Sequence, residues 1–592
     1  MTKRESIIVL LSITLCWSSS YLFIQEVPQG LSDYAYLALT SGVAGIILAI
    51  IFFRLMSSLT KQTIKHAAIL SVLITGNMLF EKMALGELPA PTVSSLAAMN
   101  IVIVPIILML RKEYPTRNNV VGIIVIIIGI VVSSRSVLKE GAGFLGVLYV
   151  VCSCVCMSLY TIVASDFTDE SNPLLLTIMQ LLFTAAIGFV LWVVTAPDSF
   201  GSLEFTPASM SYIFILAFFS KAYAYVMLMY AEKYADPVSI TVIAATDPVV
   251  TLLLAVFIPG VAGGRELLTP PALVGAAIIT LGAIIAGTDF LSPKEAADEK
   301  QSAEAELAAA DSTTSVPAAY KFESPEIKAF GNRYQVLWFA FVITLLFVLL
   351  GISIDVMHSE AGFRNLRPEN CLSVTAGLML GPIGALACSL GNFLADCFHG
   401  MYDTMTLGLV GNFIMAFIPY KAWMMLSRKR PDVHSGKHLL RYIWVSLLGA
   451  MSCACFLGIA LQYFYDRWYD GLIWQMFMNN FVFSLAFGLP LFIVLTSEGV
   501  WVMLKPEFLV GKIFTYGIPI RVRLGGISVT RAFLAALTVL LTVLMYLLYN
   551  GHNLDTSRLV QVLSLACGIC ELNICLLPIA GHGRGDRRYA SR

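Results

Sequence analysis

Long apolar runs, separated by short polar connections, dominate the chain. Runs of about 20 residues, the length that crosses a bilayer as a helix, recur too often for a soluble helical protein. The first half contains ten such segments, near 7–25, 33–53, 66–87, 91–110, 118–134, 142–165, 173–195, 208–234, 236–258 and 268–288. The second half contains eight, near 334–354, 369–381, 382–398, 405–426, 441–463, 472–495, 532–549 and 558–580. The pattern predicts an all-α polytopic membrane protein with two membrane modules.

One polar stretch, residues 289–333, separates the two series. Its acidic residues outnumber its basic ones, and its Ala, Glu and Ser content with Pro317 and Pro325 is typical of a linker that holds at most a short helix near 294–310. The predicted division is a carrier module at 1–288, an acidic linker at 289–333, a second module at 334–495, and a loop, two further spans and a basic tail at 496–592.

Composition agrees with a membrane protein and narrows the function. The chain is 58% hydrophobic and 13% charged, against roughly 25% charged residues in soluble domains. Lys+Arg and Asp+Glu are both 38, so net charge gives no indication of a nucleic-acid partner. The sequence has no zinc-protease motif, nucleophile elbow or phosphate loop, so we expect neither an enzyme nor an ATPase, and no cofactor.

The positions of the cysteines and of the basic residues bear on disulfide formation and on the orientation of the chain in the membrane. Most of the twelve cysteines lie inside apolar runs, and the alternate spacing of Cys152, Cys154 and Cys156 suits helix packing better than a metal site. The spacing indicates no disulfide framework. Basic clusters follow alternate connections in both halves, which places both termini and the linker in the cytoplasm by the positive-inside rule. We therefore expect a multi-pass protein of the cell (inner or plasma) membrane.

The first series contains an internal repeat. Three pairs of matching positions occur in the same order: Ser19-x-Tyr21 with Ser158-x-Tyr160, Pro91 with Pro237, and Val121-Gly122-x6-Gly129 with Val274-Gly275-x6-Gly282. Each repeat has five spans, an odd number, so the second repeat is inverted relative to the first. Inverted repeats are the architecture of alternating access, with the substrate site between the repeats.

Residues 7–288 resemble the drug/metabolite transporter superfamily, particularly its ten-span EamA-type members. The resembling stretches are Cys16-Trp17-Ser18-Ser19-Ser20-Tyr21, Ala224-Tyr225, Asp247-Pro248-Val249, Leu268-Thr269-Pro270 and the repeated glycine motif. The resemblance implies a carrier of small metabolites that is driven by a gradient rather than by ATP. The sequence departs from the family in having Asn100-Ile101 in place of Ser-Pro, Lys112-Glu113 in place of Gly-Glu, and Lys221 at a usually small position.

Residues 334–495 resemble the substrate-capture (S) components of energy-coupling factor vitamin transporters. The stretches that carry this resemblance are Arg367-Pro368-Glu369-Asn370, Gly381-Pro382-x-Gly384-Ala385 and Gly391-Asn392-x3-Asp396. It implies a ligand-binding module whose energy-coupling ATPase is a separate partner. The Ala-x-x-x-Ala docking pattern expected in the first span is missing, and residues 532–580 fall outside the resemblance.

Polar residues within spans supply the site candidates, because ionisable groups there are costly unless they pair or face water. In the first module the candidates are Trp17, Ser19, Tyr21, Glu81, Asn100, Tyr160, Lys221, Tyr225 and Asp247. Lys221 could bind a substrate carboxylate or pair with Glu81. Other interpretations stay open: Glu81 could snorkel to the membrane surface, Asp247 before Pro248 could mark a structural kink, and the aromatic residues could serve packing.

In the second module the candidates surround one short helical hairpin. They are Arg367, Glu369, Asn370, Asn392, Asp396 and His399. Asn392 and Asp396 are four residues apart and share a helix face. A surface ion pair between Arg367 and Glu369 and a hydrogen-bonded packing face are the alternatives to ligand capture, and we expect no metal site.

These patterns predict a transporter of a small solute by alternating access, fused to an S-component-like ligand-binding module. The expected partners are a small-molecule solute, the lipid bilayer and an energy-coupling ATPase. A membrane sensor or scaffold, in which one module binds ligand and regulates the other, is the alternative.

Overall fold

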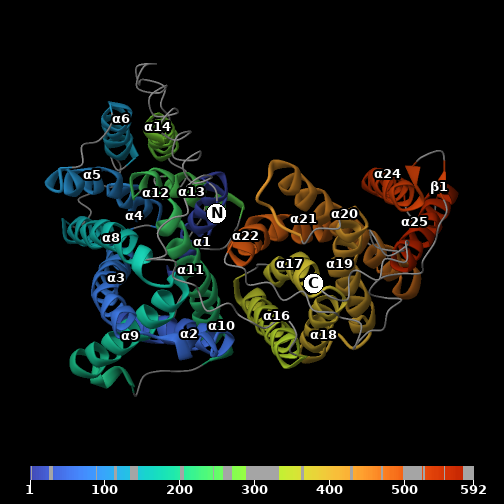
Figure 1. The fold of residues 1–592 in the computed structure, drawn as a ribbon, viewed down its shortest axis with the longest axis horizontal. Helices are drawn as coiled ribbons and strands as arrows, with labels where there is room; N and C mark the ends of the chain where they lie inside the picture. The colour runs from blue at the N-terminus through green and yellow to red at the C-terminus, as the bar shows by residue number, and fades with distance from the viewer. Residues whose placement is uncertain are drawn as a thin grey trace, which may run out of the picture. The chain divides into compact units, whose positions relative to one another are not determined.

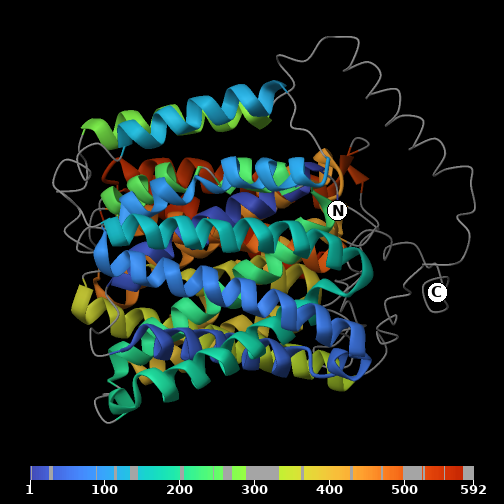
Figure 2. The same cartoon turned by 90° about the vertical axis from the view of Figure 1, so that its left-hand side faces the viewer.

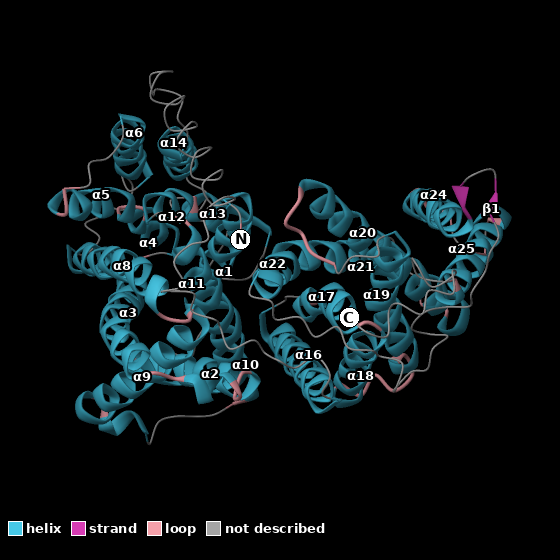
Figure 3. Cartoon of the chain, in the orientation of Figure 1, coloured by secondary structure: helices cyan, strands magenta, loops and turns pink. Residues whose placement is uncertain are grey.

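Helices make up nearly all of the described chain (Figures 1 and 3). The computed structural model describes residues 1, 3–25, 31–88, 90–112, 117–133, 144–200, 206–235, 237–244, 246–257, 270–287, 333–361, 366–426, 431–467, 471–497, 523–524, 527–552, 554–555 and 557–577. The predicted linker up to residue 332, its short helix and the end of the basic tail lie outside these residues. The chain divides into two units, residues 2–326 with 360–363, and residue 1 with 327–359 and 364–592.

The first unit holds the helices of the ten predicted spans. They are α1 (Lys3–Gln25), α2 (Asp33–Ile51), η1 (Leu55–Ser58), α3 (Lys61–Glu87), α4 (Ala90–Ala97), α5 (Asn100–Leu110), α6 (Arg117–Ser133), α8 (Phe144–Glu170), α9 (Pro173–Thr195), η2 (Pro197–Phe200), α10 (Pro207–Ile215), η3 (Leu216–Tyr223), α11 (Ala224–Tyr234), α12 (Pro237–Ala244), α13 (Asp247–Phe257) and α14 (Pro270–Gly287). The segment η3 is π-helical and joins α10 to α11 without a turn.

Local signals in the sequence explain where several of these helices begin. The side chains of Ser32, Thr60, Asn172 and Thr206 each accept a hydrogen bond from a backbone N–H of the first turn of the helix that follows. Such N-caps satisfy donors that have no partner inside the helix. In α9 and α10 a proline occupies the first turn, where its missing N–H costs nothing.

The second unit has longer helices and one small hairpin. Its elements are α16 (Arg333–Ala361), η4 (Pro368–Asn370), α17 (Cys371–Leu380), α18 (Pro382–Phe398), α19 (Met405–Leu426), α20 (Gly436–Tyr465), α21 (Leu472–Phe483), η5 (Ser484–Gly488), α22 (Leu489–Ser497), β1 (Arg523–Leu524), β2 (Ile527–Ser528), α24 (Val529–Tyr549) and α25 (Arg558–Leu576). The strands β1 and β2 pair antiparallel. Gly381 joins α17 to α18 with φ of +61°, a conformation that glycine adopts without strain.

The predicted fold class is confirmed. Among the described residues, 12 helices are long and apolar enough to cross a membrane, and shorter apolar helices accompany them. Several predicted runs agree closely with the helices, such as 405–426 with α19 and 382–398 with α18. The protein is therefore a polytopic α-helical membrane protein with two modules.

Helix packing in the first unit follows the predicted repeat. α2 packs against α9 and α6 packs against α14, each helix against its counterpart in the other repeat. α3 of the first repeat packs against α8 of the second, and α11 of the second repeat packs against α1 of the first. The two contacts are therefore equivalent when the repeats are exchanged. α6 and α14 run side by side in both views (Figures 1 and 2). This is the packing expected of two repeats related by a twofold axis.

The repeated glycines lie where α6 and α14 touch. A Cβ atom on Gly129 would lie 2.9 Å from the carbonyl oxygen of Gly275, and a Cβ on Gly282 would lie 2.9 Å from that of Gly122. Both distances are shorter than real Cβ contacts, so each glycine allows the backbone of the partner helix to approach closely. The contact is reciprocal, which explains why both repeats carry the same glycine spacing.

Candidate functional site

Two spans of the first unit are each built from two helices. The fourth span breaks between Ala97, where α4 ends, and Asn100, where α5 begins. The ninth breaks between Ala244 at the end of α12 and Asp247 at the start of α13. Asn100 and Asp247 therefore hold the same position in the two repeats. Non-helical backbone at the middle of a span is tolerated where it is buried in protein or lines a cavity.

Both breaks face one cavity inside the first unit. The cavity holds about 860 Å³ of empty space, part of it open to solvent. Helices of both repeats line it, as the repeat architecture predicts for a substrate site. Six of the nine residues selected from the sequence lie on its wall: Trp17, Glu81, Asn100, Lys221, Tyr225 and Asp247.

Lys221 brings a positive charge to this cavity from the π-helical segment η3. It is only 5% exposed, and its Nζ lies 5.9 Å from the centre of the Tyr225 ring, within cation–π range. The carboxylate of Glu81 acts on it electrostatically. Because π-helical turns often occur at functional sites, both the position and the backbone of Lys221 distinguish it from a packing residue.

Asp247 brings a carboxyl group to the same cavity lining. It is 7% exposed, and its Oδ1 is buried without a hydrogen-bond partner. Its backbone oxygen accepts hydrogen bonds from the hydroxyls of Ser18, at 3.1 Å, and Thr251, at 2.8 Å. A buried carboxyl oxygen without a partner, facing a cavity, is suited to a polar or cationic group of a solute.

Tyr160 and Ser19 are not among the residues that line the cavity. Tyr160 is fully buried behind it, where its hydroxyl accepts a 3.0 Å hydrogen bond from Gln180 and its ring meets Tyr225 edge-on at 6.3 Å. Ser19 donates to the backbone oxygen of Cys16. The Tyr21 side chain lies outside the described residues. Tyr160 thus supports Tyr225, which also packs against Trp17 with ring centres 5.8 Å apart.

The cavity wall contains polar residues that sequence reasoning missed. Asn77 donates a 2.8 Å hydrogen bond to the hydroxyl of Ser153, and Ser158 donates to the side-chain oxygen of Asn100 at 3.4 Å. Ser158 is also the repeat counterpart of the candidate Ser19 in the Ser-x-Tyr motif. The repeat was therefore a usable signal: the partner of a candidate residue in one repeat identifies a candidate in the other.

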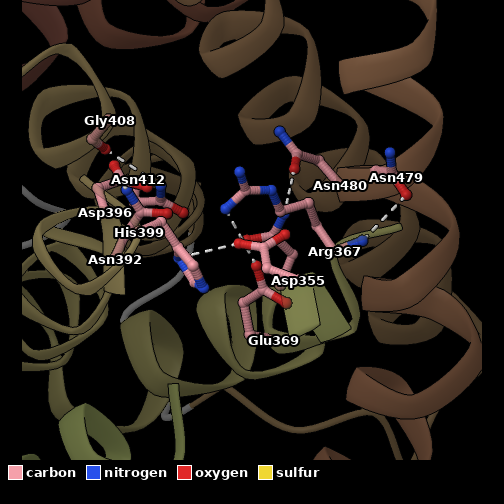
Figure 4. A network of polar contacts seen from close by, with 11 residues as sticks. Asp355, Arg367, Glu369, Asn392, Asp396, His399, Gly408, Asn412, Asn479 and Asn480 are labelled. Atoms are coloured by element: carbon pink, nitrogen blue, oxygen red, sulfur yellow. Dashed lines mark hydrogen bonds and ion pairs between the residues drawn. The ribbon is translucent and has the colours of Figure 1, made fainter. Parts of the chain in front are cut away.

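A second polar cluster, called here the Arg367 network, lies in the second unit (Figure 4). Five stretches of chain contribute: α16, η4 with the residue before it, α18 with its C-cap, α19 and α21. Its members are Asp355, Arg367, Glu369, Asn370, Asn392, Asp396, His399, Gly408, Asn412, Asn479 and Asn480. All six second-unit residues predicted from the sequence belong to it.

Arg367 lies at the centre of the network. Its Nη1 is 3.5 Å from Oε1 of Glu369, and its backbone N–H donates to the side chain of Asn479 at 3.4 Å. Arg367 and Glu369 do pair, but the carboxylate is buried, with its side chain 2% exposed against 32% for the arginine. The next residue, Asn370, donates a 2.6 Å hydrogen bond to Asn480 and thereby fixes η4 to α21.

The predicted polar face of α18 forms the other side of the network. Asn392 donates a 2.7 Å hydrogen bond to Oδ2 of Asp396, as the four-residue spacing predicts. Both residues are buried against Gly408, where a Cβ would lie 2.5 Å from the Asn392 amide and 2.6 Å from the Asp396 oxygen. His399 turns to α16, with its Nδ1 3.0 Å from Oδ2 of Asp355.

Asp355, Asn412, Asn479 and Asn480 are members that the sequence did not reveal. They lie on three other helices, and only the fold brings them to the hairpin. Among the described residues, no group of three or more His, Cys, Asp or Glu side chains is arranged to hold a metal ion. All twelve cysteines are free thiols in the structure.

Comparison with known proteins assigns the first unit. Residues 4–135 and 144–288 match the model of the EamA-like transporter family, one match for each repeat. The predicted resemblance of residues 7–288 is confirmed, whereas the resemblance of residues 334–495 to S components stays a prediction. None of the curated proteins matches the chain. A solved structure titled "Crystal structure of protein" aligns at a TM-score of 0.39 with 16% identity, over 48% of this chain and 98% of that one.

Proposed function

We propose that the first unit, which is built from two EamA-like transporter repeats, carries a small polar metabolite across the cell membrane by alternating access around the cavity. The observation that carries this proposal is the position of Lys221, Glu81 and Asp247 on one cavity wall between the repeats. Burying these ionisable groups costs several kcal/mol unless a partner or solute compensates them. A protein is expected to keep such costly buried groups where they bind a solute.

The arrangement favours a solute with polar groups of both signs. Lys221 offers a positive charge for an anionic group, while Glu81 and Asp247 offer negative charge for a donor or cation. Trp17 and Tyr225 add apolar surface beside them. Because both repeats contribute residues to the cavity lining, rocking one repeat against the other would open the cavity to each side of the membrane in turn.

The experiment is a flux measurement with the full chain in liposomes. Radiolabelled metabolites of several charge classes are screened for uptake and for counterflow, in which internal solute accelerates entry of labelled solute. A carrier shows counterflow, whereas a channel or a sensor does not. Empty liposomes and the Lys221→Ala variant serve as controls, and the absence of counterflow for every solute would contradict the proposal.

For the second unit, the Arg367 network supports ligand capture. Its polar side chains come from five separate stretches and include a buried carboxylate oxygen, Oε2 of Glu369, that has no hydrogen-bond partner. A packing face would be expected to satisfy such an atom within the protein. We propose that this unit binds a ligand as S components do, with an energy-coupling ATPase as its separate partner. The test is ligand-dependent stabilisation of the full chain that network variants abolish.

A further inference from the structure

The Arg367 network changes from partly exposed to buried across its width. The side chains of Arg367, Asp355 and His399 are 32%, 21% and 19% exposed. Glu369 and Asp396 are 1% and 5% exposed as residues. The partly exposed members are called here the rim, and the buried carboxylates of Glu369 and Asp396 the floor.

Charge within the network is unbalanced. Three carboxylates, of Asp355, Glu369 and Asp396, act on the single guanidinium of Arg367, and His399 is the other basic group that acts on Asp396. With all three carboxylates ionised, two negative charges are in excess when His399 is neutral, and one when it is protonated. Because excess charge at low exposure is costly, a bound cation or a proton on one of the carboxylates would stabilise the network.

The uncompensated charge can be assigned to the floor. Arg367 contacts Oε1 of Glu369 and leaves Oε2 of the same carboxylate buried without a partner. The Oδ2 atom of Asp355 lies 3.0 Å from Nδ1 of His399. Asp396 accepts a hydrogen bond from Asn392, a neutral amide that supplies no charge. Figure 4 shows the side chains of Asn392, Asp396 and His399 together on one side of the Arg367 and Glu369 pair.

We propose that the Arg367 network binds an organic monocation, a small amine-bearing solute whose ammonium group is held by the carboxylates of Glu369 and Asp396. An ammonium supplies both the missing charge and N–H donors for the oxygens that lack them. The surrounding asparagine side chains offer hydrogen bonds to the uncharged part of the solute. This inference rests on the proposed ligand-binding role of the second unit and adds the chemical class of its ligand.

The test uses the purified full chain in detergent and probes that differ only in charge. Methylammonium, butylammonium and benzylammonium are compared with methanol, butanol and benzyl alcohol, and with formate, butyrate and benzoate. Binding is measured by calorimetry, and stabilisation by the midpoint of thermal unfolding. We expect at least one ammonium to bind, its neutral and anionic counterparts to bind at least tenfold more weakly, and its affinity to fall with added salt.

Variants locate the bound ammonium. Asp396→Asn and Glu369→Gln keep the shapes of the side chains, and each should weaken binding at least tenfold. Gly408→Ala, which forces the Asn392 and Asp396 side chains aside without changing charge, should weaken it as well. Asp403→Asn, on a side chain that is 73% exposed, should leave the affinity unchanged. Asp247→Asn, in the cavity of the first unit, reports whether the ammonium binds there instead. Unfolding midpoints without probe show that each variant is folded.

The outcomes separate this inference from the proposed function. Binding lost in Asp247→Asn but kept in Asp396→Asn would move the amine to the first unit and overturn the inference. Binding of an anionic or neutral probe, lost in the network variants, would keep ligand capture but overturn the cationic class. If no ammonium binds better than its counterparts the class is wrong, and if a metabolite library also produces no stabilisation that depends on Glu369, ligand capture is wrong too.

Discussion

At the scale of single residues, Lys221 carries the strongest functional signal. An ammonium that is 5% exposed and has a tyrosine ring 5.9 Å away costs more to bury than an apolar side chain would. Asn100 and Asp247 are likewise polar residues inside spans, and each begins the second helix of its span. Stability does not explain these choices, whereas the proposed solute binding would.

We predict that Lys221→Ala reduces counterflow at least tenfold, or changes which solute is carried, while expression and the unfolding midpoint stay near those of the unmodified protein. Removing a buried charge relieves its desolvation cost, so a large loss of stability is not expected. Lys233→Ala is the matched control, because Lys233 lies at the end of α11 and is absent from the cavity wall. Transport by Lys221→Ala at the level of the control would return Lys221 to a structural role.

At the scale of elements, hydropathy was sufficient to locate the helices but not their interruptions. The run 405–426 coincides with α19, because the apolar stretch begins and ends where the helix does. The run 91–110 reads as one span, yet α4 ends at Ala97 and α5 begins at Asn100. Apolar side chains continue across this break, so no local signal marks it. For Asp247, a structural kink before Pro248 was one of the alternatives, because proline removes a backbone donor.

The contacts within the two sites also fall into those that the sequence predicts and those that only the fold determines. The bond between Asn392 and Asp396 follows from helix periodicity alone. The ion pair of His399 with Asp355 joins residues on different helices, so it depends on how α16 and α18 pack. The π-helical backbone at Lys221 has no pattern in the sequence that predicts it. Local spacing predicts local contacts, and tertiary packing decides the others.

The glycine contact between α6 and α14 gives a prediction at this scale. Gly129→Ala and Gly282→Ala should each destabilise the protein by about 1–3 kcal/mol, because the added Cβ meets a backbone oxygen that cannot turn aside. The reciprocal geometry predicts similar losses for the two variants. Gly86→Ala in α3 is the control, since a Cβ there meets nothing within 4 Å. Thermal unfolding in detergent is the measurement, and midpoints equal to that of the control would contradict close packing at these glycines.

At the scale of the whole molecule, the distribution of basic residues predicts an orientation. We expect both termini and the linker in the cytoplasm, because the basic clusters of both modules fall on the same side of alternating spans. Reporter fusions at Asp311 and after Arg592, active on one side of the membrane only, measure this. A linker reporter active outside would be inconsistent with an even number of spans before it, and the five-plus-five arrangement would have to be revised.

The independence of the two units is the last prediction. Each repeat of the first unit packs against the other through α2 with α9 and α6 with α14, so its helices cover one another within the unit. Among the described residues, those that line the cavity run from Trp17 to Asp247. We therefore expect residues 1–288 alone to insert, fold and show counterflow, and the chain from about residue 325 to insert and bind its ligand without transporting it. The test is to split the chain at Asp311, express the parts singly and together, and measure monodispersity in detergent and flux in liposomes. Parts that aggregate singly and recover only when expressed together would show that they share an essential interface, and the cavity would then have to be treated as part of one composite transporter.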